Sequence, residues 1–202
     1  MVIAKDLSAP NAASEIYQEV KEAGIEVNTL INNAGFGGRG KFYERKWEKD
    51  LAMLNVNVVA LTALTRMFLP DFVRRNEGRI LNVSSTAALL PGPCKPCISK
   101  AYVTSFSNAI AEELYDTNVT VTVLMPGATE SEFASTAGMN ETSLFNHTVK
   151  AREVAEEGYN AMLAGKLDVF AGVTASQRMM LAAIPIMPKR MLLRQVRHMQ
   201  EV

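Results

Sequence analysis

The sequence lacks the residue patterns that mark several classes of protein. Only two cysteines are present, too few for a disulfide scaffold and usual for a protein in a reducing cytoplasm. Lys and Arg together number 21, as do Asp and Glu, so there is no basic excess for binding nucleic acid. The longest apolar runs are shorter than the ~20 residues of a membrane span, and the N-terminal MVIAKDLS shows no signal peptide. We therefore expect a cytoplasmic globular protein that binds no nucleic acid.

Short apolar segments alternate along the chain with amphipathic ones. Strands are predicted at residues 2–7, 27–31, 78–85, 119–127 and 167–172. Helices are predicted at residues 8–23, with Ser8 as the N-cap, at 44–75, with a break near Asn57, at 96–115 and at 151–163. This alternation predicts an α/β domain over residues 1–202, with a doubly wound parallel sheet between two layers of helices.

Polar loops that contain glycine or proline follow three of the predicted strands directly. They are Asn32–Gly35, Asn82–Ser85 and Met125–Thr129. The carboxyl ends of parallel strands lie at one edge of a sheet, and ligands bind at that edge in folds of this kind. The sequence therefore predicts a ligand site formed by these loops.

Six motifs, in their order along the chain, resemble those of the short-chain dehydrogenases/reductases, over nearly the whole sequence. Asn57 in NVNVVAL, Ser85 in ILNVSS and Lys100 in SKAYVTSFS match the family's catalytic asparagine, serine and lysine. The resemblance implies a Rossmann-like fold and hydride transfer between a nicotinamide and a small carbonyl or alcohol substrate. In that chemistry a tyrosine, of pKa about 10, gives the proton, and the lysine cation favours its phenolate. The serine hydrogen-bonds the substrate oxygen, and the asparagine anchors a water that connects the lysine to solvent.

The same resemblance implies a site for NAD or NADP. Asp6-Leu7 resembles the element near the adenine ring, Asn32–Gly35 the element that supports the sheet beside the cofactor, and Pro126–Thr129 the loop that approaches the nicotinamide. The implied cofactor-binding residues are Asp6, Leu7, Asn33, Ala34, Gly35, Lys100, Pro126, Gly127 and Thr129. Family members commonly dimerise through the helices that correspond to residues 44–75 and 99–115, so we expect a homo-oligomer.

The chain departs from the family pattern at the tyrosine. Pro96 stands four residues before Lys100, on the helix face where the family has its catalytic tyrosine. Proline has no hydroxyl, and Tyr102 lies two residues beyond Lys100, roughly on the opposite face of the helix. Because a positioned acid or base typically contributes 10²–10⁴-fold to a rate, we expect this chain to be inactive or strongly impaired.

A second departure concerns the start of the chain. The family's glycine-rich loop holds the pyrophosphate at a helix N-terminus, within a unit of about 30 residues that would precede residue 2. The sequence shows no such unit, which suggests a truncated member whose cofactor binding is weakened or lost. The strand predicted at residues 2–7 would then lack its usual neighbour. We expect it to be poorly anchored or to pair with residues 27–31.

Two other functions remain open. Cys94 and Cys97 form a Cys-x-x-Cys motif at a helix start, where the helix lowers a thiol pKa, so a dithiol redox protein is one alternative. A non-catalytic subunit is the other. A metal site is not expected, since zinc needs four ligands and only the distant His147 and His198 could join the cysteines.

Residues 178–200 are rich in methionine and then basic. Leu192, Val196 and Met199 form an apolar stripe at helical spacing, with arginines off it. Such a helix packs on the body of the protein or on a second subunit, or makes weak contact with a membrane surface.

Overall fold

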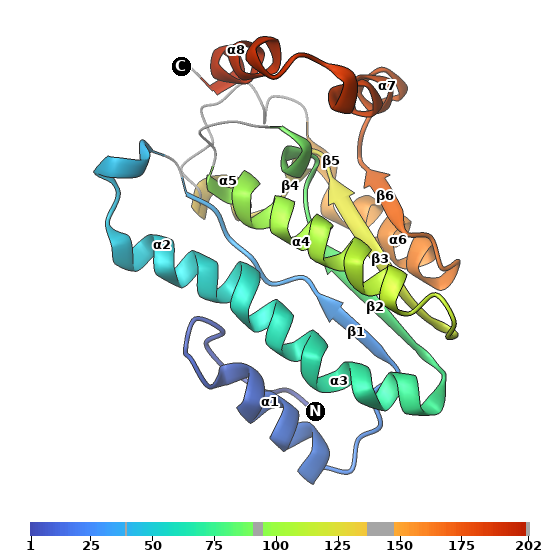
Figure 1. The fold of residues 1–202 in the computed structure, drawn as a ribbon. Helices are drawn as coiled ribbons and strands as arrows, with labels where there is room; N and C mark the ends of the chain where they lie inside the picture. The colour runs from blue at the N-terminus through green and yellow to red at the C-terminus, as the bar shows by residue number, and fades with distance from the viewer. Residues whose placement is uncertain (39, 91–94, 137–147, 201–202) are drawn as a thin grey trace.

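A computed structural model describes residues 1–38, 40–90, 95–136 and 148–200, and its centre is a four-stranded sheet (Figure 1). The strand order is β1-β2-β3-β6, and each neighbouring pair is parallel. The bounds are Thr29–Asn32 for β1, Gly78–Val83 for β2, Val119–Pro126 for β3 and Asp168–Ala171 for β6. Four of the five predicted strands are therefore confirmed.

Helices cover both faces of this sheet (Figure 1). One face carries α1 (Ala12–Glu22), α3 (Leu61–Arg75) and α4 (Lys95–Glu113). There Phe72 and Ile80, both fully buried, lie in a core to which all three helices contribute. The other face carries α6 (Ala151–Leu163), which packs on Leu81 and Leu124. Successive residues of β2 thus bury their side chains against helices on opposite faces of the sheet. The predicted three-layer α/β arrangement is therefore confirmed.

The helix predicted at residues 44–75 is not broken near Asn57, but its hydrogen-bond pattern changes there. α2 (Trp47–Leu54) leads into a π-helical turn, Asn55–Ala60, before α3 begins. Such a turn holds one extra residue and occurs frequently at functional sites. Here it turns Asn57 inward, where the residue is 1% exposed.

The continuous helical stretch Trp47–Arg75 is long and apolar enough to cross a membrane, by length and composition alone. Its Phe68 and Phe72 are buried in the core on the sheet. The core helix of a globular protein has the same composition and the same one-sided packing.

The prediction of a strand at residues 2–7 was wrong. Residues 1–6 have no regular secondary structure, and Val2 is 96% exposed. A strand needs a partner for its backbone groups, and apolar composition alone does not supply one. Among the described residues β1 pairs only with β2, so pairing of the segment with residues 27–31 is also absent. Val2 is exposed, but Lys5 pairs with Glu15 and Glu19 of α1, so poor anchoring of the segment stays a prediction.

The first helix begins later than predicted, and Ser8 does not cap it. The N-cap of α1 is Asn11, whose side chain makes no capping bond. The backbone N–H of Ser8 instead donates to Asp6 Oδ1 at 2.9 Å, which closes a turn ahead of the helix. Ser8 therefore belongs to a turn in which the Asp6 side chain bonds to the backbone two residues further along the chain.

The remaining elements are short, apart from α7 and α8 at the C-terminus. They are the 3₁₀ turns Phe42–Glu44, Thr86–Leu89 and Ile184–Ile186, with β4 (Thr129–Glu130), α5 (Phe133–Thr136), β5 (Val149–Lys150), α7 (Ala175–Ala183) and α8 (Lys189–Gln200). Leu192 and Val196 of α8 are buried against Leu181 and Ile184, in a cluster that also includes Phe170 of β6. These two members of the C-terminal apolar stripe therefore pack within the chain.

Candidate active site

The three polar loops lie side by side at the carboxyl edge of the sheet. The loop after β2 is joined to β3, because the Ser84 N–H donates to the carbonyl of Leu124 (2.7 Å) and Thr86 Oγ1 to that of Pro126 (3.1 Å). The loop after β3 is joined to β6, because the Gly127 N–H donates to the carbonyl of Ala171 (2.9 Å). The structure thus brings together the segments that hold most of the predicted site residues.

Lys100 extends from α4 to the end of β2. Its ammonium donates to the carbonyl of Val83 at 2.6 Å, and the residue is 7% exposed. Burial lowers the pKa of this amine from 10.5 to about 8, because the charged form loses its hydration. An ammonium donates three hydrogen bonds, so this position leaves donors for another ligand.

Asn57 fastens the loop after β1 to the helical layer. Its side-chain amide donates to the carbonyl of Phe36 (2.8 Å) and to Ser99 Oγ (3.0 Å), and its Oδ1 accepts from the Phe36 N–H (3.1 Å). The side chain is therefore engaged in holding the loop, a role that sequence reasoning missed. The partner Ser99 was also missed, although its place directly before the lysine was a usable signal.

Gly35 is the residue of this loop that lies against the Lys100 ammonium. A Cβ at this position would lie 3.1 Å from Lys100 Nζ and 3.1 Å from Asn57 Oδ1, tighter than ordinary packing. The neighbouring Asn33 and Ala34 are exposed, so the outer side of the loop is open. The predicted residues of this loop thus line a surface beside the ammonium group.

The two adjacent serines at the end of β2 have different surroundings. Ser84 is 3% exposed and bonds to the carbonyl of Lys100 (2.8 Å) and to Thr104 (2.7 Å), so it holds α4 on the sheet. Ser85 is half-buried, and its Oγ accepts from the Ala87 N–H at 3.1 Å. A hydroxyl that accepts one bond still has its proton to donate. Of the pair, Ser85 is therefore the one whose hydroxyl is suited to a ligand.

A chain of buried polar side chains supports the site from beneath. Asn32 donates to Asn82 Oδ1 (2.8 Å) and to Thr65 Oγ1 (3.2 Å), and Asn82 donates to Ser107 Oγ (2.8 Å). The chain joins β1, β2, α3 and α4, and satisfied buried networks of this kind fix one packing arrangement. Sequence reasoning missed Asn82, although an asparagine within the apolar ILNV was a signal.

The loop after β3 lies closely against the loop after β6. A Cβ on Gly127 would lie 2.8 Å from the carbonyl of Gly172, so only glycine fits there. Thr129 donates from Oγ1 to the carbonyl of Gly127 at 3.1 Å and pairs through β4 with β5. Pro126 is the last residue of β3.

Asp6 and Leu7 belong to the N-terminal segment, outside the sheet. Asp6 is exposed, and its hydrogen bond from the Ser8 N–H holds the pKa of the carboxyl below its usual value. Lys5 attaches the segment to α1 through ion pairs of 2.9 Å with Glu15 and Glu19. No contact of Asp6 or Leu7 with the other predicted site residues is found among the described hydrogen bonds.

The position of the missing tyrosine falls in the first turn of α4. Pro96 and Cys97 have helical backbone, whereas Cys94 lies outside the described residues, so the dithiol hypothesis stays a prediction. Tyr102 points away from the ammonium of Lys100, since its hydroxyl bonds to Thr62 at 2.9 Å. The other four tyrosines lie on α1, in the Phe42–Glu44 turn, in the turn after α4 and on α6. No tyrosine hydroxyl hydrogen-bonds to Lys100 in the described part of the chain.

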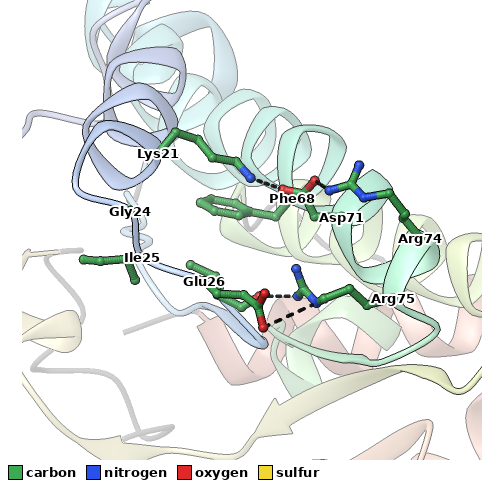
Figure 2. A pocket seen from close by; sticks show the side chains of 9 residues that line it. Lys21, Gly24, Ile25, Glu26, Phe68, Asp71, Arg74 and Arg75 are labelled. Atoms are coloured by element: carbon green, nitrogen blue, oxygen red, sulfur yellow. Dashed lines mark hydrogen bonds and ion pairs between the residues drawn. The ribbon is translucent and has the colours of Figure 1, made fainter.

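A pocket of about 350 Å³ lies at the opposite, amino edge of the sheet, between the ends of α1 and α3 (Figure 2). Figure 2 shows Lys21 reaching toward Asp71, beside Arg74, and Glu26 toward Arg75. None of the predicted site residues lines this pocket. Over the described ranges, no group of three or more His, Cys, Asp and Glu side chains is arranged to hold a metal ion.

A model of the short chain dehydrogenase family matches residues 1–142, well over half of the chain. The chain belongs to the short-chain dehydrogenase family. It is 39% identical over 113 residues to Nodulation protein G of Rhizobium meliloti (54% of this chain, 46% of that protein). It is 35% identical over 131 residues to the uncharacterized oxidoreductase YvrD of Bacillus subtilis (64% and 49%). It is 30% identical over 132 residues to an NADP-dependent 3-hydroxy acid dehydrogenase of Schizosaccharomyces pombe (64% and 51%).

This short-chain dehydrogenase chain spans about half the length of the curated relatives it matches. Among solved structures, a 7beta-hydroxysteroid dehydrogenase matches with a TM-score of 0.80 and 23% identity, over 96% of this chain and 75% of that one. A short-chain dehydrogenase from Sphingobium yanoikuyae in complex with NADPH matches with a TM-score of 0.77 and 24% identity, over 87% and 69%. These structures show that the Rossmann-like fold is shared.

Proposed function

We propose that this chain carries the nicotinamide-binding part of an NAD(P)(H)-dependent oxidoreductase for a small carbonyl or alcohol substrate. The observation that carries the proposal is the contact of Gly35, Asn57 and Lys100 at the carboxyl edge of the sheet. Structural neighbours in complex with NADPH and with NAD support a nicotinamide as the cofactor class. The buried ammonium of Lys100, which has no carboxylate partner among the described residues, supports a ligand role, because burial of a charge without a counter-charge lowers stability.

The residues present fit such a cofactor. The absence of a side chain at Gly35 leaves the surface beside Lys100 free, and the ammonium has donors beyond its bond to Val83 for cofactor hydroxyls. The other proposed contacts are Asn33, Ala34, Pro126, Gly127 and Thr129, with Asp6 and Leu7 toward the adenine. When bound, the nicotinamide supplies or accepts the hydride.

The protein's own part in the reaction is to hold the substrate oxygen. The Ser85 hydroxyl donates a hydrogen bond to that oxygen. Asn57 holds the loop after β1 against α4. Pro96 stands where a proton donor would stand and has no hydroxyl. The proposed consequence is an inactive or impaired oxidoreductase, with a loss of about 10²–10⁴-fold.

A second candidate function is that of a non-catalytic subunit in a homo-oligomer. Ile98 and Tyr102, one turn apart on α4, are 66% and 38% exposed, and Val59 between α2 and α3 is 51% exposed. Tyr102 bonds to Thr62, so the two helices present these apolar groups on a shared surface. A homodimer through these helices would cover them.

Titration with reduced cofactors tests the first proposal. We expect NADPH and reduced nicotinamide mononucleotide to bind weakly, with affinities within about tenfold, because the proposed contacts are mostly to the nicotinamide half. Gly35→Val should abolish both, since it fills the surface beside Lys100, whereas Lys21→Ala at the far pocket should change neither. Unchanged binding by Gly35→Val, measured by calorimetry, contradicts the proposed site.

Restoring the phenol tests the impaired chemistry separately. We expect Pro96→Tyr alone to leave carbonyl reduction near the wild-type level, because weak cofactor binding still limits the rate. A gain of about a hundredfold or more, in the range that a positioned acid supplies, would show that the tyrosine alone is limiting.

A further inference from the structure

The C-terminal segment differs in charge from the rest of the chain. Residues 169–200 contain no aspartate or glutamate and five lysines and arginines, in a chain whose net charge is zero. The segment includes α7 and α8, which Figure 1 shows together at one end of the molecule. A local excess of one charge in a neutral protein attracts partners of opposite charge.

The packing of α8 directs part of this charge outward. Leu192 and Val196 are 5% and 2% exposed and face the body. Arg190 and Arg194 lie two positions to either side of Leu192, which places them on the opposite side of the helix, and both are exposed. Lys189 is exposed as well. The buried stripe therefore fixes the helix so that its cations project from the surface.

Apolar side chains accompany these cations. Met191 is 53% exposed and Leu193 42%, on the two flanks of α8, and Ile186 in the preceding 3₁₀ turn is 86% exposed. These three residues and Lys189, Arg190 and Arg194 are called the basic face below. Its cations make no ion pair with any residue that the structure describes, unlike Arg178, which pairs with Glu157 at 3.5 Å.

We propose that the basic face docks on an anionic membrane surface. Cations near such a surface bind the lipid head groups, and exposed apolar side chains beside them insert at the boundary of the acyl chains. A symmetric dimer through this face is disfavoured, because a two-fold axis would bring identical cations together. The apolar stripe is not the membrane contact, since Leu192 and Val196 are already buried.

The location of the basic face relates it to the candidate site. The cluster beneath α8 includes Leu89 and Leu90 after β2, and Phe170 and Val173 at the end of β6. These residues lie at or shortly after the carboxyl ends of strands, so docking would bring that end of the molecule toward the bilayer. This placement does not depend on whether the site is catalytic.

Vesicle sedimentation of the full chain tests the proposal. We expect binding to phosphatidylcholine vesicles that contain phosphatidylserine, weaker binding as salt is raised, and none to phosphatidylcholine alone. The double variant Arg190→Gln/Arg194→Gln should partition about thirtyfold less, on the usual contribution of a cation near an anionic surface. The matched control is Lys46→Gln/Lys49→Gln at the start of α2, which removes the same charge from exposed positions and should bind as wild type.

Each alternative partner gives a different result. Ile186→Ser should weaken vesicle binding without changing retention on immobilised polyglutamate, and an equal effect on both would point to an acidic protein instead. A change of oligomeric state in the arginine variant, measured by light scattering, would make the face a subunit contact. No binding to anionic vesicles at low salt overturns the proposal outright, provided that circular dichroism shows both double variants to be folded.

Discussion

Two lysines at opposite edges of the sheet have pKa values shifted in opposite directions. Lys100 lies at the carboxyl edge, where burial lowers its pKa to about 8. Lys21 lies at the amino edge, where its hydrogen bond with Asp71 raises its pKa (Figure 2). The first lysine is buried without a carboxylate partner in the described part of the chain, and the second is half-exposed and paired.

The difference shows that the charge of Lys21 stabilises the fold, whereas the charge of Lys100 lowers its stability. At the amino edge, Asp71 accepts bonds from both Lys21 and Arg74, so each of these cations has an anionic partner. At the carboxyl edge, the desolvated ammonium of Lys100 opposes folding. A charge that lowers stability and lies beside a glycine-lined surface is better explained by a ligand than by packing.

The largest effect on stability is expected from removing the Asn57 side chain at the carboxyl edge. Asn57→Ala removes the three hydrogen bonds with the Phe36 backbone and Ser99 Oγ, so we expect a loss of about 3 kcal/mol in the free energy of unfolding. Urea denaturation measures it, with Asn160→Ala, an exposed asparagine on α6, as the control within about 0.5 kcal/mol of wild type. A loss below about 1 kcal/mol would show that the loop is held by other contacts.

Removing the buried charge should have the opposite sign. The lowering of the Lys100 pKa from 10.5 to about 8 means that burying the ammonium destabilises the fold by roughly 3 kcal/mol. Loss of the hydrogen bond to Val83 costs about 1 kcal/mol. Lys100→Met should therefore stabilise the fold by about 2 kcal/mol at pH 7. The unfolded chain binds the extra proton between pH 8 and 10.5, so wild-type stability rises there and the advantage of the variant shrinks. Urea midpoints across this range measure the difference. A constant difference would mean that Lys100 is not desolvated.

At the amino edge, substitution of the carboxylate should destabilise. Asp71→Asn removes the partner of Lys21 and Arg74, and we expect a loss of about 1 kcal/mol at pH 7. The pair with Lys21 holds the pKa of Asp71 below its usual value, so this contribution is present above about pH 4 and disappears as pH falls through the native pKa. Thermal melts of the variant and of Asp116→Asn, an exposed control, at pH 7 and pH 3 measure it.

The smallest effect is expected from Lys21→Met, which completes the comparison of the two lysines. Because Lys21 is half-exposed, its loss should destabilise by less than that of Asp71, and high salt should remove the difference. The sign is opposite to that of Lys100→Met. Equal signs for the two lysine variants would remove the distinction between the edges.

The sequence predicted most of the sheet because local pattern and tertiary need coincide there. Residues 119–126 are apolar or β-branched almost throughout, as a strand covered on both faces requires. Residues 2–7 begin with the apolar Val-Ile-Ala but have no strand partner in the described structure, and pairing is a property of the fold rather than of a segment.

The candidate site was predictable in position but not in its contacts. Family motifs named Asn57, Ser85 and Lys100, yet which of two adjacent serines is buried depends on α4, far along the chain. The same holds for Asn57, whose partners Phe36 and Ser99 are 21 and 42 residues away. The roles of these residues, the oligomeric state and the cytoplasmic location stay predictions.

In the described part of the chain β1 is paired along one edge only, and this has a consequence for handling the protein in solution. The backbone groups of successive strand residues point in alternate directions, so those of Thr29 and Ile31 point away from β2, toward the open edge of β1. Ile31 is 46% exposed. An open edge of this kind is a template for another chain's strand. Its shortness, four residues, limits how many bonds an intruding strand gains. Concentrated samples of this chain should therefore be checked for aggregation as well as for correct folding.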